Sequence, residues 1–338
     1  MTPPAMGSLM LLAPASGPGI GGGHLMRCLT LAEALRARGL ACALRVGEAG
    51  ADLARRFGGD AYEVLSAPVE VLLQQRRFDA VIIDDYAIGL QDERRWRAHV
   101  RTLAVIDDLA DRPHACDLLI DPGYGRDDRD YSGLVPAEAK LLTGPAFAPI
   151  RPGFAALRGG ALARPLAPEP RRAFVSFGLS DVEGVAARAI VLIRARHPAL
   201  PLDVALSADA VSLNALQARA ASDPNLHLHV DTPHVAPLMA GADMAVGAGG
   251  ASTWERACLG LPTLAVIVAD NQRTMIQTMA ADGAVLAVDL HGGDFDAAFD
   301  AALLTLGDAA VRTAMGNRSA ALCDGLGAAR IADALVAL

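Results

Sequence analysis

The chain has 338 residues, which exceeds the length that one hydrophobic core usually serves, so we expect two domains. Its residues are 52% hydrophobic and only 4% aromatic, and its formal net charge is −8. Because nucleic-acid binding needs positive surfaces and aromatic stacking platforms, these values argue against a nucleic-acid partner.

The first residues, MTPPAMGSLMLLAP, lack the positive charges that begin a signal peptide, and the longest later apolar run is far shorter than a membrane span. We therefore expect a cytoplasmic protein without membrane contact. The five cysteines are widely spaced, so we expect them to be reduced and buried rather than joined in disulfides or bound to zinc.

A strand over residues 9–13 leads into the segment GIGGGHLMRCLTLAEAL, residues 19–35. Gly22, Gly23 and the glycines at positions 19 and 21 allow a sharp turn and a close approach of a ligand to the backbone. His24 then begins a helix, whose dipole favours the neutral imidazole that a general base needs. A glycine turn of this kind also binds nucleotide phosphates, and it can serve as a turn alone. The apolar face of the helix comprises Leu25, Cys28, Leu29, Ala32 and Leu35.

Short apolar runs then alternate with helical patterns, as in a parallel α/β sheet. The run DAVII, residues 79–83, is followed by Asp84, Asp85 and Tyr86. Ligands bind beyond the carboxyl ends of parallel strands, so we expect this triplet to face the same cleft as His24. Alternatively, the aspartates cap a helix and hold a loop.

Two later strands also end in acids: residues 103–106 precede Asp107 and Asp108, and residues 118–120 precede Asp121. Three acidic strand ends resemble a metal site, but no histidine or glutamate lies at ligand spacing, and aspartates commonly begin turns. We therefore predict a site without metal.

Residues 159–172, rich in Pro, Gly and Ala, show neither helical nor strand periodicity and are predicted to link two domains. The first domain covers residues 1–158 and the second covers residues 173–322. Both begin with a strand and a small-residue turn, so we expect two doubly wound Rossmann-like domains that face each other across a cleft. A final amphipathic helix is expected within residues 323–338.

The second domain contains GAGGASTWERACLGLP, residues 247–262, at a predicted helix start. Backbone amides freed by Gly249 and Gly250, with the hydroxyls of Ser252 and Thr253, suit a diphosphate. Glu255 can accept both hydroxyls of a ribose, or it can reach back to the backbone in a capping box.

Two further turns of this domain carry polar residues. Asn271 opens the next helix beside Gln272, where it either caps the helix or binds a sugar. Three nearby histidines, at 227, 229 and 234, lack an evident third zinc ligand. The substrate contacts predicted over the whole chain are Gly22, Gly23, Arg27, Asp85, Gly178, Ser180, Gly249, Gly250, Ser252, Thr253, Glu255 and Gln272.

Seven collinear motifs resemble the UDP-sugar hydrolases of pseudaminic acid biosynthesis over nearly the whole chain. They are GIGGGHLMRCLTLAEAL, VIIDDYAIG, VIDDLADRPHACDLLIDPGYG, LLTGPAFAPIRPGF, VSFGLSD, GAGGASTWERACLGLPTLAVIVADNQ and CDGLGAARIADAL. More distantly, both glycine turns resemble those of the UDP-N-acetylglucosamine transferase that makes lipid II. Two motifs depart from the family pattern: strand one lacks the usual Arg and Asp, and Leu179 replaces a glycine.

The resemblance implies a glycosyltransferase-B fold with UDP held mainly by the second domain and the last helix crossing back to the first. It also implies hydrolysis of UDP-2,4-diacetamido-2,4,6-trideoxy-β-L-altropyranose, or a close UDP-sugar, in a pathway that supplies flagellin glycosylation. Water attacks the anomeric carbon with inversion, and no cofactor or metal takes part. By the resemblance, His24 is the base, and Tyr86 and Asn271 line the sugar pocket.

Two other classes of function remain open. A glycosyltransferase would use the same UDP-sugar with an acceptor hydroxyl in place of water, but no exposed apolar or basic run suggests a lipid acceptor. A sugar-nucleotide binding protein would not need His24, Tyr86 and Asn271 together. We expect a monomer whose partners are a UDP-sugar and water.

Overall fold

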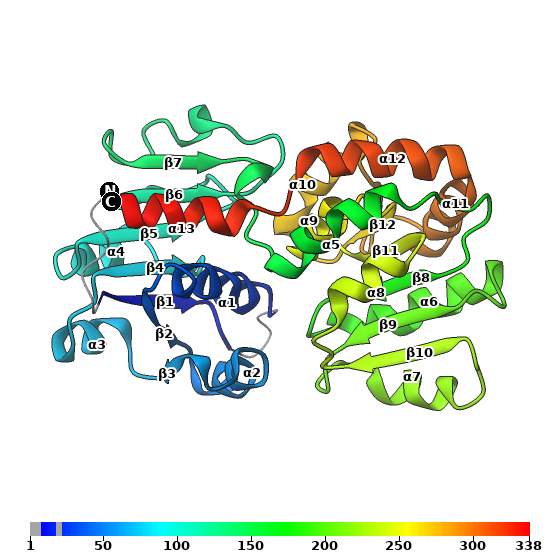
Figure 1. Ribbon diagram of the computed structural model, residues 1–338, viewed down its shortest axis with the longest axis horizontal. Coiled ribbons are helices and arrows are strands. Elements are labelled where there is room, and N and C mark those ends of the chain that lie inside the picture. Colours follow the sequence, from blue (N-terminus) through cyan, green and yellow to red (C-terminus); the bar gives the residue numbers. More distant parts are fainter. Residues whose placement is uncertain (1–7, 18–21) are drawn as a thin grey trace. The chain divides into compact units, whose positions relative to one another are not determined.

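The computed structural model describes residues 8–17 and 22–338, and the chain divides into two compact units. Unit 1 is Met1–Pro149 with Leu326–Leu338, and unit 2 is Ile150–Gly325. Each unit is a parallel sheet with helices packed against it (Figure 1). This architecture confirms the predicted doubly wound α/β class.

The sheet of unit 1 has seven parallel strands in the order β3-β2-β1-β4-β5-β6-β7. Alternate residues along each strand enter two separate cores: Leu12 and Ile82 pack on one face, and Leu11 and Val81 pack on the other. The strands are β1 Leu9–Pro14, β2 Ala41–Arg45, β3 Glu63–Leu65, β4 Ala80–Asp84, β5 Thr102–Ile106, β6 Leu118–Asp121 and β7 Lys140–Thr143.

In the part of unit 1 that the structure describes, five α-helices pack against this sheet. The predicted apolar face of α1 is buried, because Leu25, Cys28, Leu29, Ala32 and Leu35 all lie in the core. The last helix, α13, packs against α1 and adds buried apolar side chains to the same core (Figure 1). The helices are α1 Gly23–Arg36, α2 Glu48–Gly58, α3 Val69–Gln75, α4 Leu90–Arg97 and α13 Gly327–Ala337, with short 3-10 turns at Gly59–Ala61, Asp128–Tyr131 and Pro145–Phe147.

The sheet of unit 2 has six parallel strands in the order β10-β9-β8-β11-β12-β13. Its strands are β8 Ala173–Ser176, β9 Leu202–Leu206, β10 Leu226–Val230, β11 Met244–Ala248, β12 Thr263–Ile267 and β13 Leu286–Asp289. Its helices are α5 Pro152–Ala163, α6 Val185–Arg196, α7 Leu213–Ala220, α8 Val235–Gly241, α9 Ser252–Cys258, α10 Asp270–Ala281, α11 Phe295–Gly307 and α12 Ala309–Leu322.

The segment expected to be a linker, residues 159–172, begins inside a helix. α5 runs through Ala163, despite its Gly159–Gly160 pair, and packs against α8 and α9. Arg158 on α5 donates hydrogen bonds to the carbonyls of Cys258, Ala320 and Cys323, which end α9 and α12. Tertiary contacts of this kind outweigh the poor helix propensity of the glycines.

The first turn of unit 2 also differs from the predicted one. The helix expected from Val182 begins at Val185, after a 3-10 turn at Val182–Gly184. Asp181 has a positive φ of 42° and accepts hydrogen bonds from the amides of Ala186 and Ser212. Its buried carboxylate therefore holds the start of α6, and the turn after β8 is longer than the sequence suggested.

In both sheets the strand order reverses at a point that ligands commonly use. The reversal lies between β1 and β4 in unit 1 and between β8 and β11 in unit 2. In such sheets the crevice beyond the carboxyl ends of the two diverging strands binds the ligand. The segments that follow these four strands contain most of the predicted site residues.

All five cysteines are free, and all of them are buried, as the sequence predicted. Within residues 8–17 and 22–338, every helix is too short or too polar to cross a lipid bilayer.

Candidate active site

The structure places His24 against a buried carboxylate. His24 is the second residue of α1, and its Nδ1 lies 2.6 Å from Oδ1 of Asp84, the last residue of β4. An ionised carboxylate only accepts hydrogen bonds, so the proton of this contact lies on Nδ1. The neutral ring then carries its lone pair on Nε2, which is the arrangement of a histidine held as a general base by an aspartate.

Arg27 keeps Asp84 ionised inside the protein. Asp84 is fully buried, and Arg27 donates to it through Nε at 2.9 Å and Nη2 at 2.6 Å. Burial raises the pKa of Asp84, but the positive charge of Arg27 and the hydrogen bonds that Arg27 and His24 donate outweigh it, so the pKa lies below its usual value. Arg27 Nη2 lies 3.1 Å from His24 Nδ1 because both nitrogens donate to the same atom, Asp84 Oδ1.

A second carboxylate joins Arg27 to Tyr86. Asp108, which follows β5, accepts from Arg27 Nη1 at 2.8 Å and from the Tyr86 hydroxyl at 2.5 Å. The Tyr86 ring meets the His24 ring edge-on, with 4.9 Å between centroids and 81° between planes. The guanidinium of Arg112 lies 5.8 Å from the centroid of the Tyr86 ring. Three predicted residues, His24, Arg27 and Tyr86, therefore form one connected cluster.

The other predicted residues of unit 1 form turns beside this cluster. Asp85 accepts a hydrogen bond from the amide of Ala87, which is the turn-forming role weighed as its alternative. Gly22 precedes α1 and Gly23 is its first residue, which is exposed. The glycines predicted at positions 19 and 21 lie outside the described residues. Contact of Asp85, Gly22 and Gly23 with substrate remains a prediction.

A buried polar network lies next to the cluster at the ends of β5 and β6. Burial lowers the pKa of His114, but its contacts with the negatively charged carboxylates of Asp107 and Glu93 outweigh it and raise the pKa to about 9. His114 Nδ1 is 2.7 Å from Glu93 Oε1, and its Nε2 is 3.7 Å from Asp107 Oδ2. The Tyr131 hydroxyl lies 2.8 Å from Asp121 Oδ2, and burial raises the pKa of Asp121 to about 6. Among the described residues, His114 Nε2 has no hydrogen-bond partner, whereas His114 Nδ1 and the Tyr131 hydroxyl are bonded to buried carboxylates. These buried contacts support the fold beside the site.

In unit 2, one backbone amide of the glycine turn that follows β11 already donates a hydrogen bond within the protein. The amide of Gly249 donates to the Val266 carbonyl at 2.8 Å, so the expectation that Gly249 frees its amide for a phosphate is wrong. A methyl group at Gly249 would come within 2.6 Å of Ile276 Cγ1, whereas one at Gly250 would meet only Gln272 Nε2 at 3.6 Å. Gly249 is therefore needed for packing against α10.

The two hydroxyls of this turn differ in exposure. Thr253 is 1% exposed, and its oxygen accepts a hydrogen bond from Arg256 Nη2 at 3.0 Å. This hydroxyl supports Arg256 and does not face a ligand, which corrects the prediction that it binds phosphate. Ser252 is half-buried, and its oxygen accepts from Arg256 Nη1 at 3.1 Å.

Glu255 is held by an arginine that the sequence did not single out. Its Oε1 accepts from Arg151 Nε at 3.2 Å and Nη2 at 3.0 Å. α9 has no side-chain cap, so Glu255 does not form the capping box that was its alternative role. Both contacts engage Oε1, so a ribose hydroxyl would be accepted mainly by Oε2.

The remaining predicted residues lie at the ends of β8 and β12. Gly178 is exposed with φ of 83°, and Ser180 is half-buried. Gln272 Oε1 accepts from the Val268 amide at 3.1 Å, beside the glycine turn. Asn271 is an exposed residue in the first turn of α10, after the cap position, so it does not cap the helix. Contact of these side chains with a sugar or a phosphate remains a prediction.

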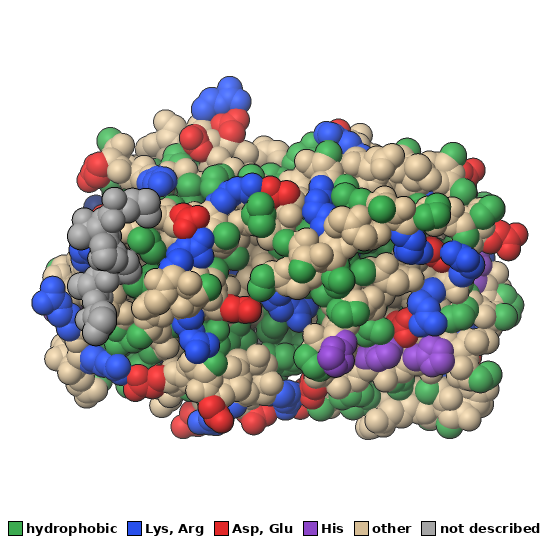
Figure 2. Space-filling model, viewed as in Figure 1, with side chains coloured by type: hydrophobic (Ala, Val, Ile, Leu, Met, Phe, Trp, Pro, Cys, Tyr) green, Lys and Arg blue, Asp and Glu red, His purple; other side chains and the backbone are tan. Residues whose placement is uncertain are grey.

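Among residues 8–17 and 22–338, no three His, Cys, Asp or Glu side chains are grouped so that they could hold a metal ion. His229, weighed as a zinc ligand, instead pairs with Asp203 through Nε2 at 2.8 Å. Basic and acidic side chains are interspersed on the displayed face of both units (Figure 2).

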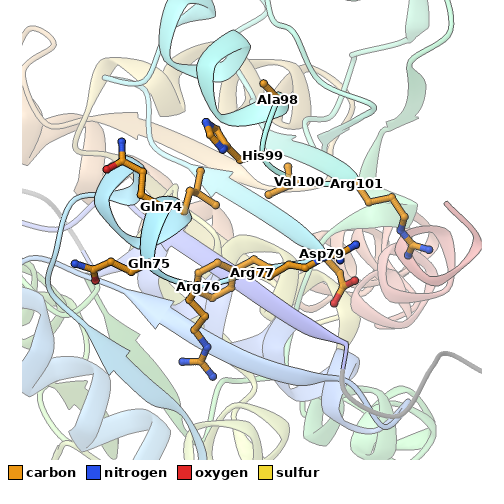
Figure 3. Close-up of a pocket in the computed structure, with 11 residues that line it drawn as sticks. Gln74, Gln75, Arg76, Arg77, Asp79, Ala98, His99, Val100 and Arg101 are labelled. Carbon is orange, nitrogen blue, oxygen red and sulfur yellow. The ribbon is translucent and has the colours of Figure 1, made fainter.

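A surface hollow of about 510 Å³ lies at the other end of the unit 1 sheet. It is lined by residues 73–79, which end α3 and precede β4, and by residues 98–101, which precede β5 (Figure 3). The hollow therefore lies at the amino ends of these strands, whereas Asp84 and Asp108 lie at the carboxyl ends. It takes no part in the candidate site.

The sequence alone did not identify four residues of the site. Asp84 was expected to face the same cleft as His24 but had no assigned role, and Asp108 was considered only as an acid at a strand end. Arg151 and Arg256 had no assigned role. The order of the strands was the missing signal, since it brings the ends of β4 and β5 beside α1. The side-chain contacts of the two arginines have no local sequence signal.

No model of a known protein family matches the chain. UDP-2,4-diacetamido-2,4,6-trideoxy-β-L-altropyranose hydrolase of Campylobacter jejuni is 26% identical over 274 residues, which cover 78% of this chain and 93% of that protein. The fold is similar to that of MurG from Acinetobacter baumannii, with a TM-score of 0.67, 15% identity and coverage of 98% of this chain and 99% of that one. UDP-GlcNAc 2-epimerase from Neisseria meningitidis, bound to UDP-GlcNAc, matches with a TM-score of 0.61, 12% identity and coverage of 98% and 100%. The chain therefore has the glycosyltransferase-B fold.

Proposed function

We propose that the protein is an enzyme that processes UDP-sugars and, more specifically, hydrolyses UDP-2,4-diacetamido-2,4,6-trideoxy-β-L-altropyranose or a close UDP-6-deoxy diacetamido sugar. The observation that carries the proposal is the 2.6 Å contact between His24 Nδ1 and the buried Asp84 carboxylate. The Campylobacter hydrolase, which covers 78% of the chain, supports the choice of substrate.

In the proposed reaction, His24 Nε2 removes a proton from water as the water oxygen bonds to the anomeric carbon. The bond between that carbon and the phosphate oxygen breaks on the opposite face, so configuration inverts and UDP leaves with the bond electrons. The imidazolium that forms is stabilised by Asp84, whose own charge is balanced by Arg27. Tyr86 packs against the ring of His24 and fixes its orientation.

We assign UDP to unit 2, at the turns that follow β8 and β11. Gly178, Ser180, Gly250 and Ser252 would meet the diphosphate, and Glu255 would accept a ribose hydroxyl. Hydrogen bonds to the leaving phosphate lower the energy of the transition state, because negative charge develops there. Asn271 and Gln272 would contact the sugar.

The test is incubation of the purified protein with this UDP-sugar and no acceptor, followed by chromatography of UDP and of the free sugar. We expect both products in equal amounts, with the rate unchanged by chelators. If UDP appears only after an acceptor is added, the protein is a glycosyltransferase of the same fold. Binding without turnover would make it a sugar-nucleotide binding protein.

A further inference from the structure

Arg256 is a buried cation beneath the glycine turn of unit 2. It is 1% exposed and lies one turn into α9, from which its side chain reaches back to the end of β11. Nη2 donates to the Ala248 carbonyl at 2.8 Å and to Thr253, and Nη1 donates to Ser252. Nε has no hydrogen-bond partner.

The positive charges of the other buried arginines are compensated by carboxylates or by several backbone carbonyls, whereas that of Arg256 is not. Arg27 pairs with two carboxylates, and Arg194 pairs with Asp223. Arg312 has no such pair, but it donates to four backbone carbonyls, those of Leu306, Gly307, Ala167 and Pro168. Among the described residues, Arg256 has no carboxylate at ion-pair distance and only one carbonyl partner.

The guanidinium nevertheless stays charged at neutral pH. Burial lowers the pKa of Arg256 to about 10, the smaller opposing effect of the Glu255 charge included, and this value remains well above 7. A buried charge without a counter-charge is costly in free energy, and the cost falls when an anion binds nearby. Unit 2 therefore has a positive charge under the turn that follows β11, and among the described residues no carboxylate lies at ion-pair distance from it.

Ser252 connects this charge to the surface. A guanidinium can only donate hydrogen bonds, so the Ser252 oxygen is the acceptor and its own proton points away from Arg256. Ser252 is half-buried whereas Thr253 and Arg256 are buried, so Ser252 is the member of the group that a ligand can reach. A hydroxyl polarised by a cation is a stronger donor to an anion.

We propose that Arg256 is a positioning residue for the diphosphate of the substrate, which it serves as a buried counter-charge and by fixing Ser252 as a donor to a phosphate oxygen. The inference rests on the proposed function, because it takes the anion to be a nucleoside diphosphate. The inference predicts that Arg256 strengthens the binding of the phosphate groups and leaves the binding of the uridine moiety unchanged.

The test compares the binding of uridine and of UDP by calorimetry to the full chain and to the Arg256→Met, Ser252→Ala and double variants. We expect Arg256→Met to weaken UDP binding about tenfold or more, while uridine affinity stays within about twofold. Ser252→Ala should weaken UDP binding selectively, and the double variant should lose less than the sum of the single losses, because the two residues act through one hydrogen bond. Arg312→Met, the matched buried arginine, should leave the ratio of UDP to uridine affinity unchanged.

Equal losses for UDP and uridine in Arg256→Met, or an unchanged UDP affinity, would overturn the inference and make Arg256 a structural residue. If Arg256→Met does not fold, Ser252→Ala decides: a loss confined to UDP supports the inference, and an unchanged UDP affinity refutes it. If the unaltered protein binds no UDP, the proposed function fails instead, so the two failures are distinct.

Discussion

At the scale of single residues, the proposed chemistry depends on which nitrogen of His24 is protonated. Asp84→Asn places an amide where the carboxylate accepts from Nδ1, so the imidazole is no longer held in the base-competent tautomer. We expect kcat to fall about 10²-fold or more, as for His24→Ala. Asp52→Asn, which alters an exposed pair with Arg56, is the control and should keep full activity. Normal turnover by Asp84→Asn would contradict the role of Asp84.

His114 gives stability a pH dependence. Its pKa of about 9 in the folded chain exceeds its unfolded value of about 6.5, so the folded state binds the proton more tightly. This contribution is complete below pH 6.5 and is lost as the pH rises through 9. We expect the free energy of unfolding, measured with urea, to fall over this range, and to fall less steeply in His114→Gln. Equal slopes would show that His114 is not the group responsible.

The positions of His24 and Tyr86 could be predicted from the sequence, because a glycine turn and a strand end mark them locally. Arg27 was predicted as a substrate contact, whereas its buried side chain pairs with Asp84 and Asp108. Asp84 could not be told apart from Asp85, since the two are adjacent acids of the same type. The register between β1 and β4 distinguishes the two aspartates: Asp84 pairs with Pro14 on β1 and is buried, whereas Asp85 enters the turn.

At the scale of elements, the turn after β11 depends on a glycine that packing requires. Gly249→Ala should lower the free energy of unfolding by about 1–3 kcal/mol, because its methyl group would overlap Ile276 on α10. Gly250→Ala has ordinary van der Waals space and should change stability little. Urea unfolding of the two variants measures the difference, and equal stabilities would contradict the packing role.

Most strands could be predicted because parallel strands are short apolar runs followed by acids or glycines. The bounds of α5 and α6 could not, because side chains far away in the sequence determine them. Arg158 joins α5 to the ends of α9 and α12, and Asp181 reaches forward to the amide of Ala186. Local propensity alone favours a break at Gly159 and an earlier helix start at Val182.

At the scale of the whole molecule, unit 1 combines two distant parts of the chain, because the last helix, α13, packs in its core. Ile331 and Leu335 of α13 are buried in the same core as α1. Ile331→Ala should cost about 2–5 kcal/mol and should reduce hydrogen-exchange protection in α1 while the strands of unit 2 stay protected. Loss of protection confined to unit 2 would contradict this assignment.

The fold of each unit followed from the alternation of strands and helices, but the substrate does not follow from the fold, because the same architecture hosts different reactions. The central claim is that water, activated by His24, attacks the anomeric carbon. The most direct measurement is turnover in ¹⁸O-labelled water with mass spectrometry of both products. We predict the label in the free sugar and none in UDP. Label in the phosphate of UDP, or no free sugar at all, would contradict the claim.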